Sequence, residues 1–301
     1  MSVPPPELEP AGARRHAAAA ALPSGVPERP ARKRLPLAGH VGELALAPLY
    51  RVYTHRLRER VRRAPLPQHV AVILDGNRRW ASELGLTEPG AGHRHGAAKI
   101  DELLGWCSAL DIGEVTVWAL SGENVGARPS AQLESLYDVV AAKLESLAEA
   151  ARDPGLPLRI RVLGRREPLP PRLRAAVERV ESASADEGLR LNVALGYSGR
   201  DELVDACRQL VRDLAQQGVD SGAMAEHVTR EALADRLYTA GGPDPELIIR
   251  TSGELRLSGF LLWQSAHSEF YFTDVYWPAL RELDFLRALR TFQQRERRYG
   301  S

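Results

Sequence analysis

Several arginines and one aspartate in this sequence follow short apolar segments of the kind that form buried strands. Taken singly, each is a weak signal, because Asp-Gly is a common turn and arginine pairs usually lie on surfaces. Together they indicate a specific chemistry, since an arginine fork binds phosphate oxygens bidentately and Mg²⁺ prefers few carboxylates plus substrate phosphate. Four arginines could bind two diphosphates, with a Mg²⁺ ion on the aspartate neutralising one of them. These residues are Asp75, Arg79, Arg128, Arg250 and Arg256, with the nearby serines Ser252 and Ser258.

The elements that must position these side chains alternate between strand-like and helix-like patterns. Continuous apolar runs predict strands buried on both faces, and apolar residues three and four apart predict helices. The alternation predicts an α/β fold, a single domain at 66–301 with a mainly parallel central sheet flanked by helices. In such sheets ligands bind beyond the carboxyl ends of the strands, where the residues above fall. The predicted strands are 70–74, 115–120, 158–163, 191–195 and 247–249, and the predicted helices are 46–63, 93–110, 133–147, 171–183, 200–217 and 283–298.

The composition excludes several classes of protein. Forty Lys and Arg against 39 Asp and Glu give a formal charge of +1, which argues against a strongly basic nucleic-acid binder. Two cysteines, Cys107 and Cys207, cannot build a disulfide scaffold or a cysteine-based zinc site. No apolar run approaches the roughly 18 residues that span a bilayer, so we expect no transmembrane segment. The P-loop, H-E-x-x-H and C-x-x-C motifs are also absent from the sequence.

The charge is unevenly distributed along the chain. Residues 1–65 carry 12 basic and 5 acidic residues, a net +7, whereas the remainder carries 28 and 34, a net −6. Residues 1–45 are basic and rich in proline and alanine, which predicts a disordered extension, and residues 46–65 predict an amphipathic helix. The extension is interpreted as a solvated tail, with a transit peptide or an arm that contacts a membrane surface as alternatives.

Five blocks of the sequence, in order, resemble the signatures of the cis-prenyltransferases, the undecaprenyl diphosphate synthase family. The first block is HVAVILDGNRRWA at 69–81, and the strongest is IRTSGELRLS at 249–258, which continues through FLLWQ to Glu269. Blocks at 92–96, 121–124 and 191–202 lie between them. The similarity covers about residues 66–300. It implies a reaction in which an allylic diphosphate loses its diphosphate as isopentenyl diphosphate attacks, giving a Z double bond.

The resemblance also implies roles for individual residues. Asp75 would bind Mg²⁺ and the allylic diphosphate, and Glu269 would complete the metal site. Asn124 occupies the position to which the family assigns the proton acceptor; because an amide is a poor base, positioning the leaving proton or a phosphate is the alternative role. The residues implied in substrate binding are Gly76, Asn77, Arg78, Arg79, Trp80 and His93 beside the allylic diphosphate, Ser121, Gly122, Glu123 and Arg128 in the second loop, and Arg250, Arg256, Leu257 and Ser258 around isopentenyl diphosphate.

The enzyme implied is a Mg²⁺-dependent homodimer in the cytoplasm, with peripheral contact to a membrane as a further expectation and no nucleic-acid partner. A growing isoprenoid would need an apolar cleft. The stripe from Leu133 to Leu147 has two interpretations, the lining of that cleft or ordinary core packing.

Departures from the family pattern leave the product open. Leu120 stands where the family usually has an aromatic residue, Val125 stands where it has tryptophan, and residues 88–91 contain no arginine. The altered second loop makes branched or cyclic coupling of C5 allylic diphosphates an alternative reaction. A non-catalytic accessory subunit is the alternative from another class.

Overall fold

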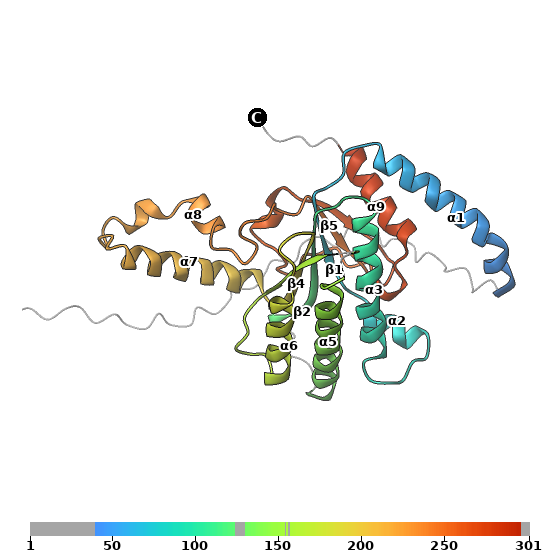
Figure 1. The fold of residues 1–301 in the computed structure, drawn as a ribbon, viewed down its shortest axis with the longest axis horizontal. Coiled ribbons are helices and arrows are strands. Elements are labelled where there is room, and N and C mark those ends of the chain that lie inside the picture. The colour runs from blue at the N-terminus through green and yellow to red at the C-terminus, as the bar shows by residue number, and fades with distance from the viewer. Residues whose placement is uncertain (1–39, 124–129, 154, 156, 296–301) are drawn as a thin grey trace, which may run out of the picture. The chain divides into compact units, whose positions relative to one another are not determined.

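The computed structural model describes residues 40–123, 130–153, 155 and 157–295, and a six-stranded sheet forms its centre (Figure 1). The strands lie in the order β3-β4-β2-β1-β5-β6, and all neighbouring strands are parallel. The predicted α/β fold is therefore confirmed. The elements are α1 (His40–Arg62), β1 (His69–Ile73), α2 (Asn77–Glu83), α3 (Ala91–Ser108), β2 (Glu114–Ser121), α5 (Ser130–Ala150), β3 (Leu158–Leu163), α6 (Pro171–Ser182), β4 (Leu189–Tyr197), α7 (Gly199–Gln216), α8 (Arg230–Ala234), β5 (Leu247–Arg250), β6 (Glu269–Phe272) and α9 (Glu282–Gln294).

Every predicted strand and helix is present, with boundaries shifted by a few residues, and β3 has the predicted bounds. The sequence analysis misses three short elements, α2, α8 and β6, which have seven, five and four residues. Segments of this length span at most two helical turns or two strand periods. Their apolar residues therefore show no readable periodicity.

Helix α1 begins at His40, whereas the sequence predicts a disordered extension up to residue 45. The helix and the predicted extension therefore overlap at residues 40–45. The segment Glu43–Ala47 consists of strong helix formers, which extends the helix toward the N-terminus. Residues 1–39, the rest of the predicted extension, lie outside the described residues. Neither α1 nor any other described helix combines the length and apolar character needed to cross a membrane.

Alternation along the strands divides the apolar core between the two faces of the sheet. Val70 and Val72 of β1 belong to the larger cluster, which includes side chains of α3, α5, α6 and α9. Ala71 and Ile73 belong to the smaller cluster, which Phe260 closes from the loop after β5. Because successive side chains point to opposite faces, the continuous apolar run of β1 is buried on both sides.

The register of the sheet brings the predicted site residues to one edge. Ile73 at the end of β1 is level with Trp118 of β2 and with Arg250 at the end of β5. The loops that follow β1 and β5 therefore leave the sheet side by side. This arrangement places Asp75 next to the loop that begins at Thr251.

Candidate active site

Asp75 and Arg250 form a salt bridge beyond the carboxyl ends of β1 and β5. Arg250 Nη2 lies 3.0 Å from Asp75 Oδ2. Arg250 Nη1 donates to the Ser258 hydroxyl at 3.1 Å and to the carbonyl of Arg256. The Arg250 side chain is only 6% exposed, and its Nε has no partner among the described residues. A buried donor without a partner is costly, so the position of the Arg250 guanidinium is not explained by its contacts within the described residues alone.

The backbone and charge of Asp75 are held by its neighbours. The buried Thr251 hydroxyl accepts from the Asp75 N–H at 3.0 Å, and the Gly76 N–H donates to Asp75 Oδ1 at 2.7 Å. Burial alone would raise the pKa of Asp75, but the hydrogen bond and charge of Arg250, with smaller contributions from Gly76 and Arg79, outweigh it. The pKa of Asp75 therefore lies below its ordinary value. At neutral pH the side chain is a carboxylate able to bind a cation.

Two exposed arginines flank this pair. Arg79 of α2 donates to the Ser252 hydroxyl at 2.7 Å and lies 3.5 Å from the Asp75 carboxylate. Glu254 lies 3.6 Å from Arg79 and forms an ion pair with Arg256. Their side chains are 48% exposed for Arg79 and 64% exposed for Arg256. A carboxylate of the chain itself therefore contacts both guanidiniums, and a phosphate group could replace it there.

The loop after β5 has an unusual backbone. Ser252, Ser258 and Leu261 adopt positive φ angles of 74°, 52° and 45°, which are rare for residues other than glycine. Such conformations cost about 1–3 kcal/mol each and cluster at functional sites. The Ser252 N–H donates to the Val275 carbonyl at 2.8 Å, which helps to hold this shape. The loop thereby presents the hydroxyls of Ser252 and Ser258 to Arg79 and Arg250.

Glycines bring the α2 segment against its neighbours. Gly76, at φ 98°, lies so close to Tyr276 that a Cβ would be 2.6 Å from the ring atom Cδ1. A Cβ on Gly92 of α3 would lie 2.8 Å from the carbonyl carbon of Asn77. Asn77 itself donates to the Leu74 carbonyl at 2.9 Å, while its buried Oδ1 has no partner among the described residues.

We expect Gly92→Ala to lower the free energy of unfolding by about 1–3 kcal/mol, because the new methyl group would push against the backbone of Asn77. Gly105→Ala is the matched control: it lies in the same helix with no atom within 4 Å of the new Cβ. It should raise stability by about 0.5–1 kcal/mol. Urea unfolding of both variants measures this. Equal effects of the two substitutions would contradict the close approach.

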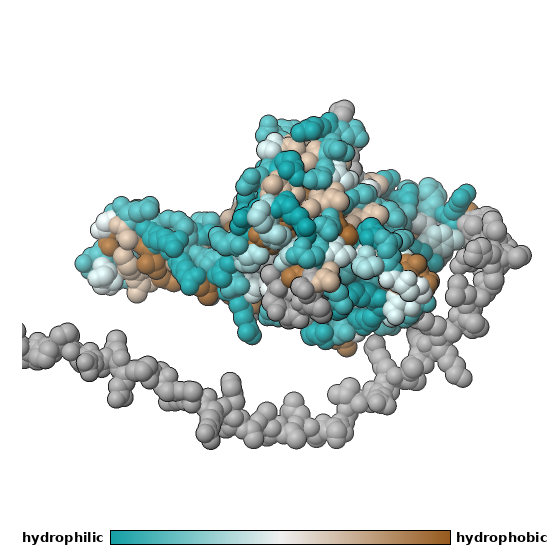
Figure 2. All heavy atoms as spheres, turned by 90° about the horizontal axis from the view of Figure 1, so that it is seen from below, coloured by the Kyte–Doolittle hydropathy of each residue, from teal (hydrophilic) through white to brown (hydrophobic). Residues whose placement is uncertain are grey.

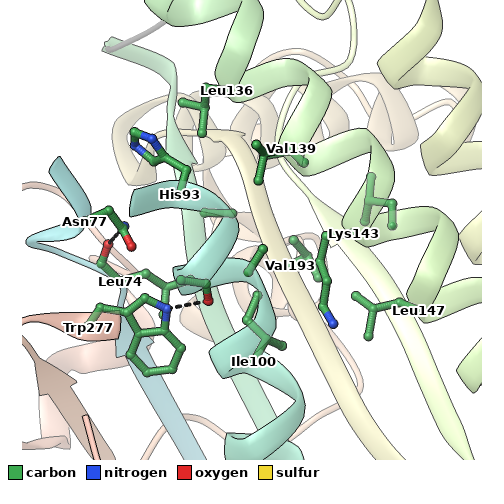
Figure 3. A pocket seen from close by; sticks show the side chains of 15 residues that line it. Leu74, Asn77, His93, Ile100, Leu136, Val139, Lys143, Leu147, Val193 and Trp277 are labelled. Carbon is green, nitrogen blue, oxygen red and sulfur yellow. Dashed lines mark hydrogen bonds between the residues drawn. The ribbon is translucent and has the colours of Figure 1, made fainter. Parts of the chain in front are cut away.

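An apolar pocket begins beside this cluster, at Asn77 and His93 (Figure 3). It runs between α3 and α5 over the sheet, with a cavity volume of about 50 Å³. Trp277 lines it and donates from its indole to the Gly96 carbonyl at 2.7 Å. The α5 residues Leu136, Val140, Leu144 and Leu147 line the pocket and also belong to the larger core cluster. The apolar stripe therefore both lines a pocket and packs in the core.

The structure also describes most of the other residues predicted for the site. Arg78 is exposed, and the Trp80 ring lies 4.8 Å from the ring of His95. Leu257 packs against the smaller core cluster. At the end of β2, Ser121 and Gly122 are half-buried and Glu123 is exposed. Asn124 and Arg128 lie outside the described residues.

Glu269 and Asp75, which the resemblance implies at one metal site, lie far apart within the chain. Glu269 begins β6 and is level with Leu247, which in turn is level with Val70. Asp75 lies five residues beyond Val70, which corresponds to about 16 Å along the strand direction. The two carboxylates therefore lie toward opposite ends of the sheet, and Glu269 instead pairs with Arg295. The resemblance implies that Glu269 completes the metal site; within one chain Glu269 and Asp75 do not meet, because β6 runs parallel to β1.

Tyr276 and Trp277 also belong to the site, although the sequence analysis does not select them. The Arg79 guanidinium lies 5.7 Å from the centre of the Tyr276 ring, a cation–π contact. The backbone N–H of Trp277 donates to the backbone carbonyl of Asp75 at 3.0 Å. Both residues lie about 200 positions beyond Asp75 in the chain. No local pattern connects them to it.

Comparisons with known proteins agree with this geometry. Residues 73–300 match the protein-family profile described as "Putative undecaprenyl diphosphate synthase". The chain is 50% identical over 259 residues to an isoprenyl transferase of Thermus thermophilus, covering 85% of this chain and 98% of that protein. It is 48% identical over 254 residues to a (2Z,6E)-farnesyl diphosphate synthase of Thermobifida fusca, covering 84% and 97% of the two chains. The crystal structure of lavandulyl diphosphate synthase from Lavandula x intermedia, in complex with dimethylallyl diphosphate, is similar with a TM-score of 0.72 and 32% identity, covering 78% of this chain and 99% of that one.

Proposed function

Because this chain belongs to the undecaprenyl diphosphate synthase family of cis-prenyltransferases, we propose that it condenses isopentenyl diphosphate with an allylic prenyl diphosphate to form a Z-prenyl diphosphate. The observation that carries the proposal is the direct junction of a charged cluster and an apolar pocket. Asp75, Arg79 and Arg250 suit diphosphates, and the pocket that begins at Asn77 suits a hydrocarbon chain. A prenyl diphosphate has these two parts.

In this reaction the bond between the allylic carbon C1 and its diphosphate oxygen breaks, and C1 bonds to C4 of isopentenyl diphosphate. A proton then leaves C2 of the former isopentenyl unit, and inorganic diphosphate is released. Negative charge develops on the departing diphosphate. A guanidinium already in place at Arg79, beside Asp75, would stabilise that charge more than the ground state, which lowers the barrier.

The two substrates are assigned by the family resemblance together with the geometry. The allylic diphosphate would lie beside Asp75 and the 76–80 segment, with His93 at the start of the pocket. Isopentenyl diphosphate would lie against Arg250, Arg256, Leu257 and Ser258. Ser121, Gly122, Glu123 and Arg128 of the second loop keep their proposed role in substrate binding. Asn124 keeps its proposed role of accepting or positioning the leaving proton.

The residues present fit a Mg²⁺ ion. Asp75 is an ionised carboxylate beside arginines that can hold the phosphates. Mg²⁺ commonly takes one or two protein carboxylates, with substrate phosphate and water completing its shell. The described residues contain no group of three or more His, Cys, Asp or Glu suited to a metal. Bound there, Mg²⁺ would neutralise the leaving diphosphate.

The product of the purified protein tests this function. With Mg²⁺, isopentenyl diphosphate and geranyl or farnesyl diphosphate, we expect products longer than the primer by whole C5 units, with new double bonds in the Z configuration. Mass spectrometry and NMR measure both properties. Absence of elongated product with every allylic primer would overturn the proposal.

A second reaction, branched or cyclic coupling of two C5 allylic units, is favoured by one observation, the similarity to lavandulyl diphosphate synthase bound to dimethylallyl diphosphate. Incubation with dimethylallyl diphosphate alone separates the two reactions, because linear elongation requires isopentenyl diphosphate. A C10 product formed without isopentenyl diphosphate would favour branched or cyclic coupling. The intact charged cluster argues against the accessory-subunit alternative.

A homodimer is proposed as the active form. Its support, beyond the resemblance, is a pair of exposed valines on α7, Val204 and Val211, which are 44% and 50% exposed. They are seven residues apart and lie on one face of the helix. Figure 2 shows apolar atoms along the α7–α8 segment, at the left in that view. Light scattering should give twice the mass of one chain, and a monomer mass in the active protein would contradict the dimer.

A further inference from the structure

The apolar pocket contains a charged side chain that the family resemblance does not explain. Lys143 of α5 lines the pocket and is only 9% exposed, although lysine is rarely buried. The other described lining residues are uncharged or, for His93, near the charged cluster. Figure 3 shows the Lys143 stem running into the pocket, with Ile100 and Leu147 near its ammonium end.

The partner of Lys143 lies on α3, the helix on the other side of the pocket from α5. The Lys143 ammonium forms an ion pair with Asp101 of α3, whose side chain is 57% exposed. Because α3 and α5 are the two helices that enclose the pocket, this ion pair connects its walls. The methylene stem of Lys143 lies against apolar neighbours while its charge reaches the surface carboxylate. The Lys143 side chain in the pocket and its ion pair with Asp101 at the surface connect α5 to α3, and we call them together the cross-bar.

The position of Lys143 limits how far the pocket extends from its start before it reaches a charged side chain. Leu136 lies close to His93 at the start of the pocket, and Lys143 lies seven residues further along α5 (Figure 3). Seven residues of helix rise about 10 Å, which accommodates the hydrocarbon of about two isoprene units. Beyond this depth a chain meets the Lys143 stem and its ion pair. Going further requires displacing the lysine or burying an unpaired ammonium against hydrocarbon, and both are costly.

We propose that Lys143, held across the pocket by Asp101, is a specificity-determining residue that restricts this enzyme to short prenyl products. The inference rests on the proposed function, because it assigns the pocket to the allylic chain. Each condensation adds five carbons at the diphosphate end and drives the hydrocarbon end deeper. Elongation slows when that end reaches the cross-bar, so the product is released there.

The test compares product lengths of the full-length protein and three variants with excess isopentenyl diphosphate. Lys143→Met removes the charge at similar volume, and Asp101→Asn removes the partner from the surface side, so that the lysine can turn out to solvent. Both should lengthen the main product by at least one C5 unit. Lys99→Met is the matched control, because Lys99 also forms an ion pair on α3, 2.8 Å from Glu102, but does not line the pocket. Its product length should equal that of the wild type.

Unchanged product lengths in an active Lys143→Met variant would overturn the inference while leaving the proposed function intact. If Lys143→Met does not fold, unchanged product length in an active Asp101→Asn variant would overturn the inference. Lengthening by Lys99→Met equal to that by Lys143→Met would also overturn it, since the effect would then be general. A wild-type protein that forms no condensation product would overturn the proposed function and this inference with it.

Discussion

Replacement of Asp75 by asparagine is expected to lower kcat/KM by about 10³-fold in the presence of Mg²⁺. Asparagine keeps the size of the side chain and one acceptor oxygen. It loses the negative charge that Arg250 and Arg79 maintain at neutral pH. The proposed cation then has no ionised protein ligand. Steady-state kinetics over a range of Mg²⁺ concentrations measure the loss, and the Mg²⁺ concentration for half-maximal rate should rise in the variant.

Asp205→Asn is the matched control for Asp75→Asn. Asp205 also accepts an arginine fork, from Arg165, with distances of 2.8 and 2.7 Å. That hydrogen bonding lowers the pKa of Asp205 to about 2. Arg165 follows β3 and Asp205 belongs to α7, and neither is among the residues of the proposed site. Asp205→Asn should leave kcat/KM near the wild-type value. Wild-type turnover by Asp75→Asn would refute the assignment of Asp75.

Arg250→Lys is expected to lower kcat/KM by about 10²–10³-fold, although it preserves the charge. The guanidinium contacts Asp75 with one nitrogen and Ser258 and the Arg256 carbonyl with another. It keeps a third, Nε, without a described partner. An ammonium is a single point donor and cannot reproduce this planar fork. The free energy of unfolding should also fall by about 1–3 kcal/mol, because the half-buried Asp75 carboxylate loses its hydrogen bond from the buried Arg250 side chain.

Arg165→Lys is the control for Arg250→Lys, because it removes a guanidinium fork of the same kind away from the proposed site. It should change stability slightly and kcat/KM not at all. Kinetics and urea unfolding of both variants separate a role in substrate binding from a role in folding. A loss of stability in Arg250→Lys without a loss of kcat/KM would leave Arg250 a purely structural residue.

Much of the fold could be predicted because strand and helix periodicity is a local property of the sequence. The run at 70–74 is apolar at every position because β1 is buried on both faces, so its identity as a strand is visible without neighbours. Helix α1 shows the limit of this reasoning. Basic, proline-rich sequence on its N-terminal side obscured the start at His40. Strand β6 was missed because its four residues are only half-buried, whereas the equally short β5 is buried throughout and begins with a continuous apolar run.

The sequence by itself determined that Asp75 and Arg250 each follow a strand of a parallel sheet. Because parallel strands all end on the same side of a sheet, Asp75 and Arg250 must lie at the same edge. Only the tertiary structure decided which side chains touch. It placed Glu269 at the start of β6, far from Asp75, since strand order and register depend on contacts between segments distant in sequence. It also placed Lys143 across the pocket from Asp101, 42 residues away, because the packing of α3 on α5 is not encoded in any local pattern.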